Sequence, residues 1–564
     1  MYEEEIKKAV IIASGIEDVH LETPEIDSHG DYATNVAMVL AKKEKKNPKE
    51  VAEEIKGKLA KGNNLSKYVS KIEIAGPGFI NFWLNNESLI SNLEKVIKEE
   101  DKYGSSHLLK GKKIMVEYAH PNTHKEMHIG HMRTLTVGES LGRIFEFMGA
   151  KVFRANYQGD IGPHVAKSIW GTKKILEEKK TSWEEADAKF TLKEKAHLLG
   201  EGYVLGVDEY KDKGSEIDEL NISLYAKDKK EMPTYELSRK WSLDYYNVFY
   251  TRFGTKFDRL FFESEIADKG KETVIDNIGE VFTKSEGAVI FDGEKYGLHK
   301  RVFITKDGNA TYEAKEMGLI PLQYKTFEFD RNVHVVANEQ TGYFKVVFKA
   351  MEVLNSKFKE KLFHLPMGMV NLVGKKMSSR TGEIFTVDDL LDEVKSYLTP
   401  LIDKEIKTKE KDDIAEVTTI GAIKYSVLKV NPKSDVIFDV KKSVSLHGNS
   451  GPYLQYTYAR CQSVLKKAKN TKKDKINELN KEELKLLRSF AQFQGIMVNA
   501  TNNYSPNTIC NFLNDLAQKY NSFYNKHKII GEKNQYQRIE ITKATGQILE
   551  NGLNLLGINA PKRM

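Results

Sequence analysis

Residues 114–370 alternate short apolar runs with helical stretches, and this alternation constrains the fold more than any other feature of the chain. IMVEY, VFRANY, NVHVVA and LFHLPMGMV are typical of buried strands, whereas residues 129–147 and 343–354 have helical periodicity. Strands separated by helices favour a parallel, doubly wound α/β sheet. Residues 165–260 have a charged helical pattern, so we expect them to form an insertion in that sheet.

Two regions of different pattern flank the alternating segment. Residues 1–100 combine an amphipathic helix that begins near Pro48 with two strands around a Gly-Pro-Gly turn, which is an α+β pattern. A charged linker follows at 101–113, and after 403–413 the pattern is helical to the C-terminus. One predicted helix there has an apolar face made of Ile509, Phe512, Leu513, Leu516, Tyr520 and Phe523. We therefore expect three domains, at 1–105, 106–405 and 406–564.

The charge is distributed unevenly along the chain. Residues 441–564 contain 20 Lys and Arg against 8 Asp and Glu, a net charge of +12, whereas the first 440 residues contain 67 against 72, a net charge of −5. A basic end on a slightly acidic body indicates a polyanionic partner, and nucleic acid is favoured over a membrane.

Composition excludes several classes of protein. A hydrophobic content of 40% and an aromatic content of 10% are globular values. Two cysteines are too few for a disulfide framework or a cysteine-rich zinc site, so we expect no structural metal. No apolar run approaches the roughly 18 residues of a membrane span, and MYEEEIKKAV lacks the pattern of a signal peptide. We expect a cytoplasmic protein without a membrane partner.

The segment EYAHPNTHKEMHIGHMRT, at 117–134, lies where a predicted strand gives way to a helix. His128 and His131 would share one face of the first helical turn, and Gly130 would let a base or sugar approach the backbone. A helix N-terminus binds phosphate, and imidazole donors there can favour a pentavalent phosphate over the ground state. An isolated HxxH pattern is more often a pair of surface histidines, so the motif needs support elsewhere.

A second segment, KKMSSRTG at 375–382, follows an apolar strand and precedes a predicted helix. A loop with lysines, hydroxyl groups and a glycine can close over a triphosphate and neutralise its developing charge. An ordinary basic surface loop is equally compatible with these residues alone.

Together the two segments resemble the HIGH and KMSKS motifs of class I aminoacyl-tRNA synthetases, and the first resembles the arginyl version. The resemblance implies a Rossmann-type catalytic core with an α+β N-terminal domain and an all-α C-terminal anticodon-binding domain. It also implies that ATP, accompanied by Mg²⁺, binds to His128, Gly130, His131, Lys376, Met377, Ser378 and Ser379. Ser379 replaces the second lysine of KMSKS, and in the arginyl family a lysine before HIGH takes its role. The implied catalytic residues are thus Lys125, His128, His131 and Lys376.

A guanidinium group has only hydrogen-bond donors, so an arginine pocket needs carboxylates and carbonyl oxygens. The resemblance places five residues there: Glu117, Asn122, Tyr312, Glu316 and Gln340. Glu316 stands where the family typically has aspartate, which lengthens the side chain by one methylene. A cysteine-specific relative would be expected to use zinc, and glutamate specificity would require basic residues in place of Glu117 and Glu316.

The resemblance extends to both ends of the chain. It implies contacts with the tRNA elbow by Phe79, Asn81 and Phe82, and contacts near the anticodon by Tyr453, Tyr456, Tyr458, Arg460 and Met564. Aromatic rings beside cations suit the unstacked bases of single-stranded RNA, although core packing would explain part of these aromatics equally well.

We therefore expect a monomeric arginyl-tRNA synthetase that activates L-arginine with ATP and transfers it to the 3′-terminal ribose of tRNA(Arg). Two other functions fit the sequence less well. The intact motifs argue against a non-catalytic tRNA-binding paralogue, and the basic helical C-terminus argues against a small-molecule ligase with an adenylating fold.

Overall fold

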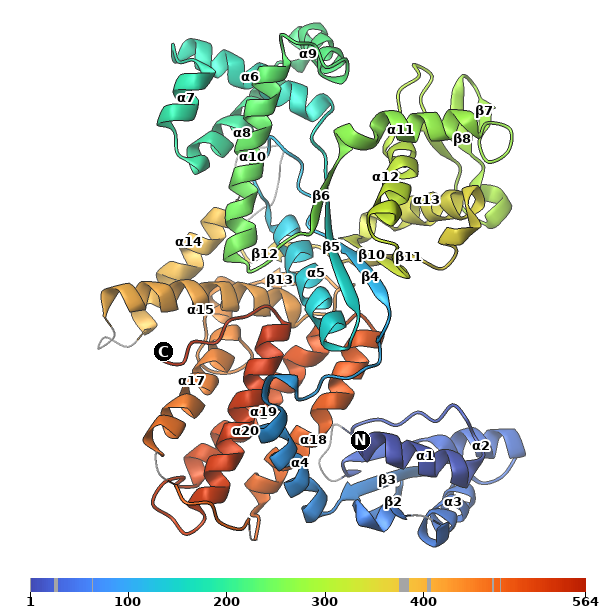
Figure 1. Ribbon diagram of the computed structural model, residues 1–564, viewed down its shortest axis with the longest axis vertical. Helices are drawn as coiled ribbons and strands as arrows, with labels where there is room; N and C mark the ends of the chain where they lie inside the picture. The colour runs from blue at the N-terminus through green and yellow to red at the C-terminus, as the bar shows by residue number, and fades with distance from the viewer. Residues whose placement is uncertain are drawn as a thin grey trace.

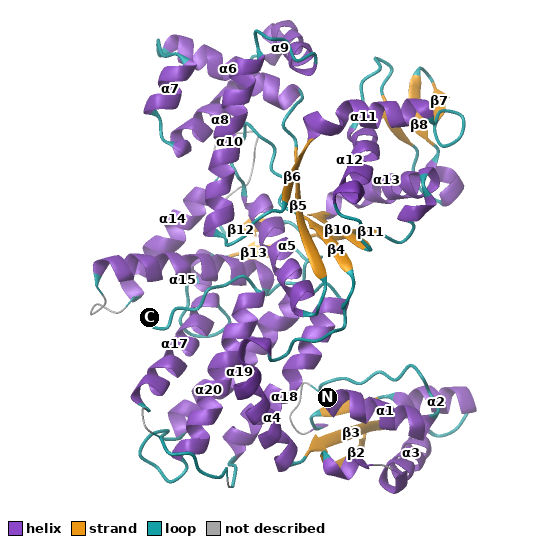
Figure 2. Cartoon of the chain, viewed as in Figure 1, coloured by secondary structure: helices purple, strands orange, loops and turns teal. Residues whose placement is uncertain are grey.

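The computed structural model describes residues 2–24, 29–62, 64–374, 385–402, 407–468, 471–476 and 478–564. Three parts follow one another along the chain (Figure 1). A small N-terminal domain lies at the lower right, a central sheet with two lobes above it fills the upper half, and the C-terminal helices lie below the sheet. Figure 2 shows the strands of the central sheet surrounded by helices.

The N-terminal domain has the α+β character that the sequence predicts. Its sheet is antiparallel with strand order β1-β3-β2, and the turn between β2 and β3 contains Gly76 and Gly78, both with positive φ. The predicted helix at Pro48 is confirmed as α3. The elements are α1 (Tyr2–Ser14), β1 (Tyr32–Thr34), α2 (Val36–Glu44), α3 (Pro48–Gly62), η2 (Asn64–Lys67), β2 (Val69–Ala75) and β3 (Phe79–Leu84). They are followed by α4 (Asn86–Glu99) and η3 (Glu100–Lys102), which lie against the C-terminal helices.

The central sheet confirms the predicted doubly wound topology. Its five strands are parallel in the order β11-β10-β4-β5-β6, so the order reverses between β10 and β4. Ligands of such sheets bind at the carboxyl ends of the strands beside this reversal point. The predicted helix after the first strand is confirmed as α5 (Ile129–Phe147). The strands are β4 (Lys113–Glu117), β5 (Lys151–Gln158), β6 (Arg259–Phe262), β10 (Arg331–Ala337) and β11 (Leu362–Met367).

Two insertions rise from the sheet and form the upper lobes in Figure 1. The predicted helical insertion between β5 and β6 is confirmed as α6 (Pro163–Glu178), α7 (Trp183–Lys189), α8 (Leu192–Asp208), α9 (Tyr210–Tyr225) and α10 (Met232–Arg252). The second lobe contains an antiparallel sheet that the sequence did not predict. The elements of the second lobe are α11 (Glu263–Asp276), β7 (Thr283–Ser285), β8 (Ala288–Phe291), η4 (Gly293–Tyr296), β9 (Arg301–Ile304), α12 (Tyr312–Thr326), η5 (Asn338–Gln340), α13 (Thr341–Leu354) and η6 (Ser356–Phe358).

The C-terminal part is mainly helical, as predicted, and the six apolar residues of the predicted face on α19 are all buried. One element departs from the prediction, because β13 lies within this region and pairs in parallel with β12. The elements are β12 (Val370–Leu372), α14 (Val387–Leu398), η7 (Thr399–Leu401), α15 (Thr408–Leu428), β13 (Val436–Phe438), α16 (Val440–Ser443), α17 (Gly451–Lys467), α18 (Lys481–Asn502), α19 (Pro506–Lys526) and α20 (Gln535–Leu555).

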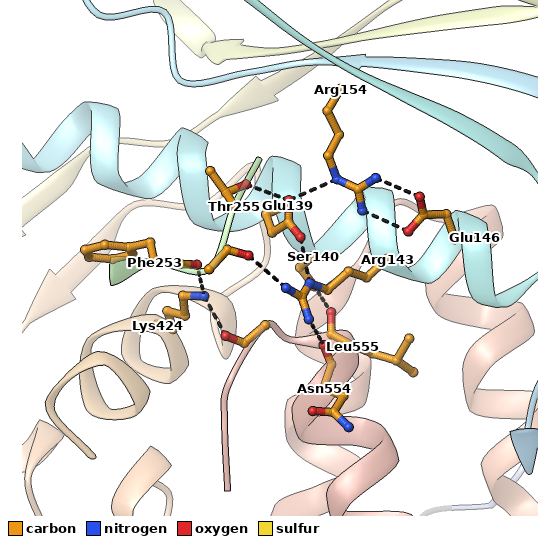
Figure 3. A network of polar contacts seen from close by, with 12 residues as sticks. Glu139, Ser140, Arg143, Glu146, Arg154, Phe253, Thr255, Lys424, Asn554 and Leu555 are labelled. Atoms are coloured by element: carbon orange, nitrogen blue, oxygen red, sulfur yellow. Dashed lines mark hydrogen bonds and ion pairs between the residues drawn. The ribbon is translucent and has the colours of Figure 1, made fainter. Parts of the chain in front are cut away.

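Polar contacts tie the C-terminal helices to α5 (Figure 3). Ser140 and Arg143 of α5 donate to the carbonyls of Leu555 and Asn554 at the end of α20, at 3.0 and 3.1 Å. Lys424 of α15 is fully buried and donates to the carbonyl that follows α10, at 2.6 Å. Burial, with Arg143 nearby, lowers the pKa of Lys424 to about 7. The helix that carries His-Ile-Gly-His at its start is therefore anchored to the last helix of the chain.

Candidate active site

The connection between β4 and α5 carries the first motif, and its backbone is constrained. Three non-glycine residues adopt positive φ there: Ala119, His120 and His124. Such conformations cost on the order of 1–3 kcal/mol each and persist only where surrounding contacts hold them. Helix α10 supplies those contacts, since the Tyr246 hydroxyl donates to the carbonyls of Asn122 and Lys125, both at 2.6 Å. The insertion therefore positions the segment that precedes His128.

His128 and His131 lie together at the N-terminus of α5. His128 is the N-cap, and its Nδ1 accepts hydrogen bonds from the backbone N–H groups of Gly130 (3.1 Å) and His131 (3.4 Å). The two imidazole rings stack with centroids 3.6 Å apart. Because Nδ1 of His128 is an acceptor, its ring proton is on Nε2, where it can be donated to a ligand.

Both imidazoles are neutral at pH 7. His128 is exposed at the helix start, but the protein atoms around its ring, together with the charge of Lys125, lower its pKa to about 4. Burial and the neighbouring His128 lower the pKa of His131 well below its usual value. Two neutral imidazoles at the positive end of a helix dipole can donate hydrogen bonds to phosphate oxygens without repelling each other.

The second motif lies outside the described residues, so Lys376, Met377, Ser378 and Ser379 are not placed. The residues that follow it are placed beside the first motif. Thr386 pairs with His128 in an isolated β-bridge, and the Val387 N–H donates to the Met127 carbonyl at 3.1 Å. The described residues that follow the second motif therefore lie at the N-terminus of α5, although about 250 residues separate them from His128 in the sequence.

Glu117 is an ionised carboxylate at the carboxyl end of β4. It is 1% exposed; Gln323 donates to one oxygen, and Nδ1 of His334 lies 3.2 Å from the other. Burial alone would raise the pKa of Glu117, but His334, His120 and Gln323 outweigh this effect and lower the pKa to about 2.

Glu316 on α12 is a second buried carboxylate, and it is near enough to Glu117 for the charge of Glu117 to act on it. The Tyr343 hydroxyl donates to Oε1 at 3.2 Å, whereas Oε2 is buried without a hydrogen-bond partner in the described part of the chain. Burial and the charge of Glu117 raise the pKa of Glu316 well above its usual range. A buried polar atom without a partner is uncommon, and a cationic ligand between the two carboxylates would supply one.

The other three predicted pocket residues are exposed around these carboxylates. Tyr312 begins α12 and is 59% exposed, and its carbonyl accepts a hydrogen bond from Tyr343 (3.2 Å). Gln340 ends η5, directly after β10, and Asn122 lies in the loop before α5. Asn122 Oδ1 lies 2.4 Å from the position that a Cβ atom on Gly159 would occupy, so a larger residue at 159 would displace the Asn122 side chain.

Several residues of this site were not predicted from the sequence. Glu263, at the start of α11, forms a buried ion pair with Lys315, whose Nζ is 5.0 Å from the ring centroid of Tyr312. Helical spacing could have placed Lys315 on the face of Tyr312, because the two are three residues apart. His334 could not have been predicted, because it faces Glu117 only through the pairing of β10 with β4.

Lys125, predicted to be catalytic, is half-buried, and its charge contributes to lowering the pKa of both His128 and His131. Its Nζ stands 4.0 Å from the ring centroid of Tyr203 on α8. The lysine is therefore close to the imidazole pair, on the side of the helical insertion.

The predicted elbow contacts in the N-terminal domain are mainly core residues. Phe82 is fully buried and Asn81 is 3% exposed, because β3 is the middle strand of its sheet, whereas Phe79 is half-buried. Neither Phe82 nor Asn81 presents its side chain to a partner in this structure.

The predicted anticodon residues divide into two groups. Tyr453 and Tyr458 are buried in the C-terminal core, while Tyr456 and Arg460 are half-buried on α17. The Arg460 guanidinium lies between the rings of Tyr456 (5.0 Å) and Tyr524 (4.8 Å), and Tyr524 was not predicted.

Met564 is half-buried and packs against the small apolar cluster of Ile402, Ile414 and Ala415. Within the described ranges, no helix is both long and apolar enough to cross a membrane, and no group of His, Cys, Asp and Glu side chains is arranged to hold a metal ion.

Comparisons with known proteins cover the whole chain. Three family models match in order: the arginyl tRNA synthetase N-terminal domain (1–84), the catalytic domain of class I (R) tRNA synthetases (92–440) and the DALR anticodon-binding domain (454–564). An arginine–tRNA ligase of Treponema denticola is 32% identical over 96% of this chain and 94% of its own length. One from Clostridium botulinum (strain Langeland) is 30% identical over 100% and 99%.

The fold agrees with these matches. The solved structure of Thermus thermophilus arginyl-tRNA synthetase superposes with a TM-score of 0.85 at 23% identity, covering 100% of both chains. The resemblance inferred from the two motifs is confirmed: this chain belongs to the arginyl-tRNA synthetase family of class I aminoacyl-tRNA synthetases.

Proposed function

We propose that this protein activates L-arginine with ATP and transfers the arginyl group to the 3′-terminal ribose of tRNA(Arg), using the residues assembled around β4 and α5. The observation that carries the proposal is the pair Glu117 and Glu316, one ionised and the other with an unpartnered oxygen, beside the neutral imidazoles of α5. A cation is the ligand that such a pair would favour, and family membership supports arginine.

The guanidinium group of arginine binds between Glu117 and Glu316, with Tyr312 packed on its face or on the aliphatic stem. Gln340 and Asn122 lie nearer the exposed rim, where Gln340 contacts the substrate amino group. Cation–π packing and charge-assisted hydrogen bonds both favour arginine over a neutral side chain. This arrangement directs the substrate carboxylate towards the N-terminus of α5.

In the activation step, a carboxylate oxygen of arginine attacks the α-phosphorus of ATP, and the bond to the bridging oxygen of pyrophosphate breaks. His128 and His131 donate hydrogen bonds to the phosphate oxygens, at the positive end of the α5 dipole. Lys125 stabilises the leaving pyrophosphate, together with Lys376, Met377, Ser378 and Ser379 of the second motif. Mg²⁺ arrives with ATP as part of the nucleotide substrate.

In the transfer step, the 2′-hydroxyl of the terminal ribose attacks the arginyl carbonyl and AMP leaves. The N-terminal domain contacts the tRNA elbow, and the C-terminal domain binds the anticodon, with Tyr456 and Arg460 as the side chains best presented for stacking. Activation requires bound tRNA in this proposal, and the enzyme works as a cytoplasmic monomer.

The decisive experiment is arginine-dependent exchange of pyrophosphate into ATP, measured with and without tRNA(Arg). We expect exchange only with tRNA. Absence of exchange under both conditions, with retained tRNA binding, would favour a non-catalytic tRNA-binding paralogue and overturn the proposal. Exchange that requires a carboxylic acid other than arginine, with no charging of tRNA, would favour a small-molecule ligase. Arginine-dependent exchange without tRNA would overturn only the tRNA requirement.

A further inference from the structure

Lys125 is held by the helical insertion at both ends. Its Nζ lies 4.0 Å from the ring centroid of Tyr203 on α8, and its backbone carbonyl accepts a hydrogen bond from Tyr246 on α10 at 2.6 Å. Within the described ranges, no carboxylate forms an ion pair with Lys125; the neighbouring Glu126 instead faces His197 at 3.6 Å.

An aromatic ring is a partner that leaves the lysine charge available. A carboxylate would neutralise the ammonium group and compete with a phosphate for it, whereas the face of a ring attracts a cation while carrying no net charge. The charge of Lys125 acts on the imidazoles at the start of α5, since it contributes to lowering the pKa of His128 and His131, and it also acts on His164 at the start of α6.

The contact with Tyr203 is part of a longer contact along α8. His197 faces Glu126, and a Cβ atom on Gly200 would lie 3.5 Å from Glu126 Oε2. Residues 197, 200 and 203 are three apart and therefore share one face of the helix. This face of α8 lies along Lys125 and Glu126, so the helix is placed to fix the side chains of both residues.

We propose that Tyr203 is a positioning residue for activation: its ring holds the Lys125 ammonium beside His128, where pyrophosphate leaves. The inference rests on the proposed function of Lys125. Without the ring, the four rotatable bonds of the lysine would let the ammonium spread over many positions, so fewer molecules would have it in place when negative charge develops on the leaving group.

The test compares Tyr203→Leu with Tyr203→Phe in the full-length enzyme, using arginine-dependent pyrophosphate exchange in the presence of tRNA(Arg). Tyr203→Leu should lower kcat by about 3- to 30-fold with the KM for arginine unchanged, the range expected for a cation–π contact. Tyr203→Phe should retain most of the rate, because it keeps the ring. In a Lys125→Ala background, Tyr203→Leu should cause no further loss.

Tyr210 provides a matched control. Its ring lies at the same distance, 4.0 Å, from the ammonium of Lys167 in the same insertion, but the described contacts of Lys167 do not include the imidazoles of α5. Tyr210→Leu should change kcat by less than about twofold, as for surface substitutions away from a site. Thermal unfolding of each variant checks that it is folded.

Equal losses in Tyr203→Phe and Tyr203→Leu would overturn the inference, and so would a further loss when Tyr203→Leu is added to Lys125→Ala. If Lys125→Ala lowers the rate but Tyr203→Leu keeps full activity, the role of Tyr203 would be overturned and the role of Lys125 would stand. Full activity of Lys125→Ala would overturn the role proposed for that lysine and, with it, the role of Tyr203.

Discussion

Replacing Glu316 by glutamine separates arginine binding from stability more sharply than any other substitution in this pocket. The glutamine keeps the size of the side chain and an oxygen acceptor for Tyr343, but it cannot ionise. Hydrogen bonds to charged groups contribute about 1.5–3 kcal/mol, so the KM for arginine should rise by roughly 10- to 150-fold. Folding should not suffer, because burial and the charge of Glu117 raise the pKa of Glu316, so the glutamine removes a negative charge that this site disfavours.

The pH dependence follows from the same raised pKa. A carboxyl group whose pKa is higher in the folded protein stabilises the fold fully below its unfolded pKa, about 4.3, and this contribution is lost as pH rises through the folded pKa. As pH rises from the unfolded pKa of Glu316 to its raised folded pKa, the empty wild-type enzyme should therefore lose stability relative to Glu316→Gln. Arginine favours ionised Glu316, so the KM of the wild type should fall as pH rises, and Glu316→Gln should remove this trend.

Three measurements test the reasoning: exchange kinetics against arginine concentration from pH 6 to pH 9, thermal unfolding of the empty enzyme, and calorimetry in buffers of different ionisation enthalpy. The wild type should release protons when arginine binds, and Glu316→Gln should release fewer. The exposed neighbour of Gln340, Glu339, is a control whose change to glutamine should leave all three unchanged. An unchanged KM in Glu316→Gln, or an equal loss of stability and affinity, would refute the role of Glu316 in binding the substrate cation.

Four further predictions concern the remaining site residues. Lys125→Ala should lower the rate of exchange far more than the affinity for tRNA, measured by exchange kinetics and by tRNA titration; equal losses would argue against a catalytic role. Lys315→Met should lower the free energy of unfolding by about 3–5 kcal/mol because it leaves Glu263 buried without its partner, and adding Glu263→Gln should recover most of this loss in urea unfolding; no recovery would show that the pair is not coupled. Arg460→Leu should raise the KM for tRNA by roughly 5- to 150-fold, the range for one stacked base, without changing the KM for arginine; a change confined to arginine would contradict this assignment. Because the pKa of His128 is lowered to about 4, the exchange rate should show no ionisation of His128 between pH 6 and pH 8, and an inflection there that disappears in His128→Gln would contradict the neutral imidazole.

The sequence determined those features that depend on local order along the chain. The alternation of apolar strands and helices predicts the parallel sheet, because periodicity and connection length follow directly from residue order. His128, Gly130 and His131 are contiguous with the strand end at Glu117, so their place at the start of a helix was also predictable. The short strand β13 was missed because its three residues have no partner until β12 lies beside them.

The tertiary structure decided which side chains meet and which charge each one carries. Glu117 and Glu316 are both glutamates in sequence, but His334 and Gln323 keep the first ionised, while burial and the first carboxylate raise the pKa of the second. Likewise, helical spacing places Tyr456 and Tyr458 on different faces of α17, but only the packing of that helix buries Tyr458 and leaves Tyr456 beside Arg460. Motifs record chemistry that lies close in sequence, whereas burial, ionisation and contacts between distant segments arise only when the folded chain excludes water and brings those segments together.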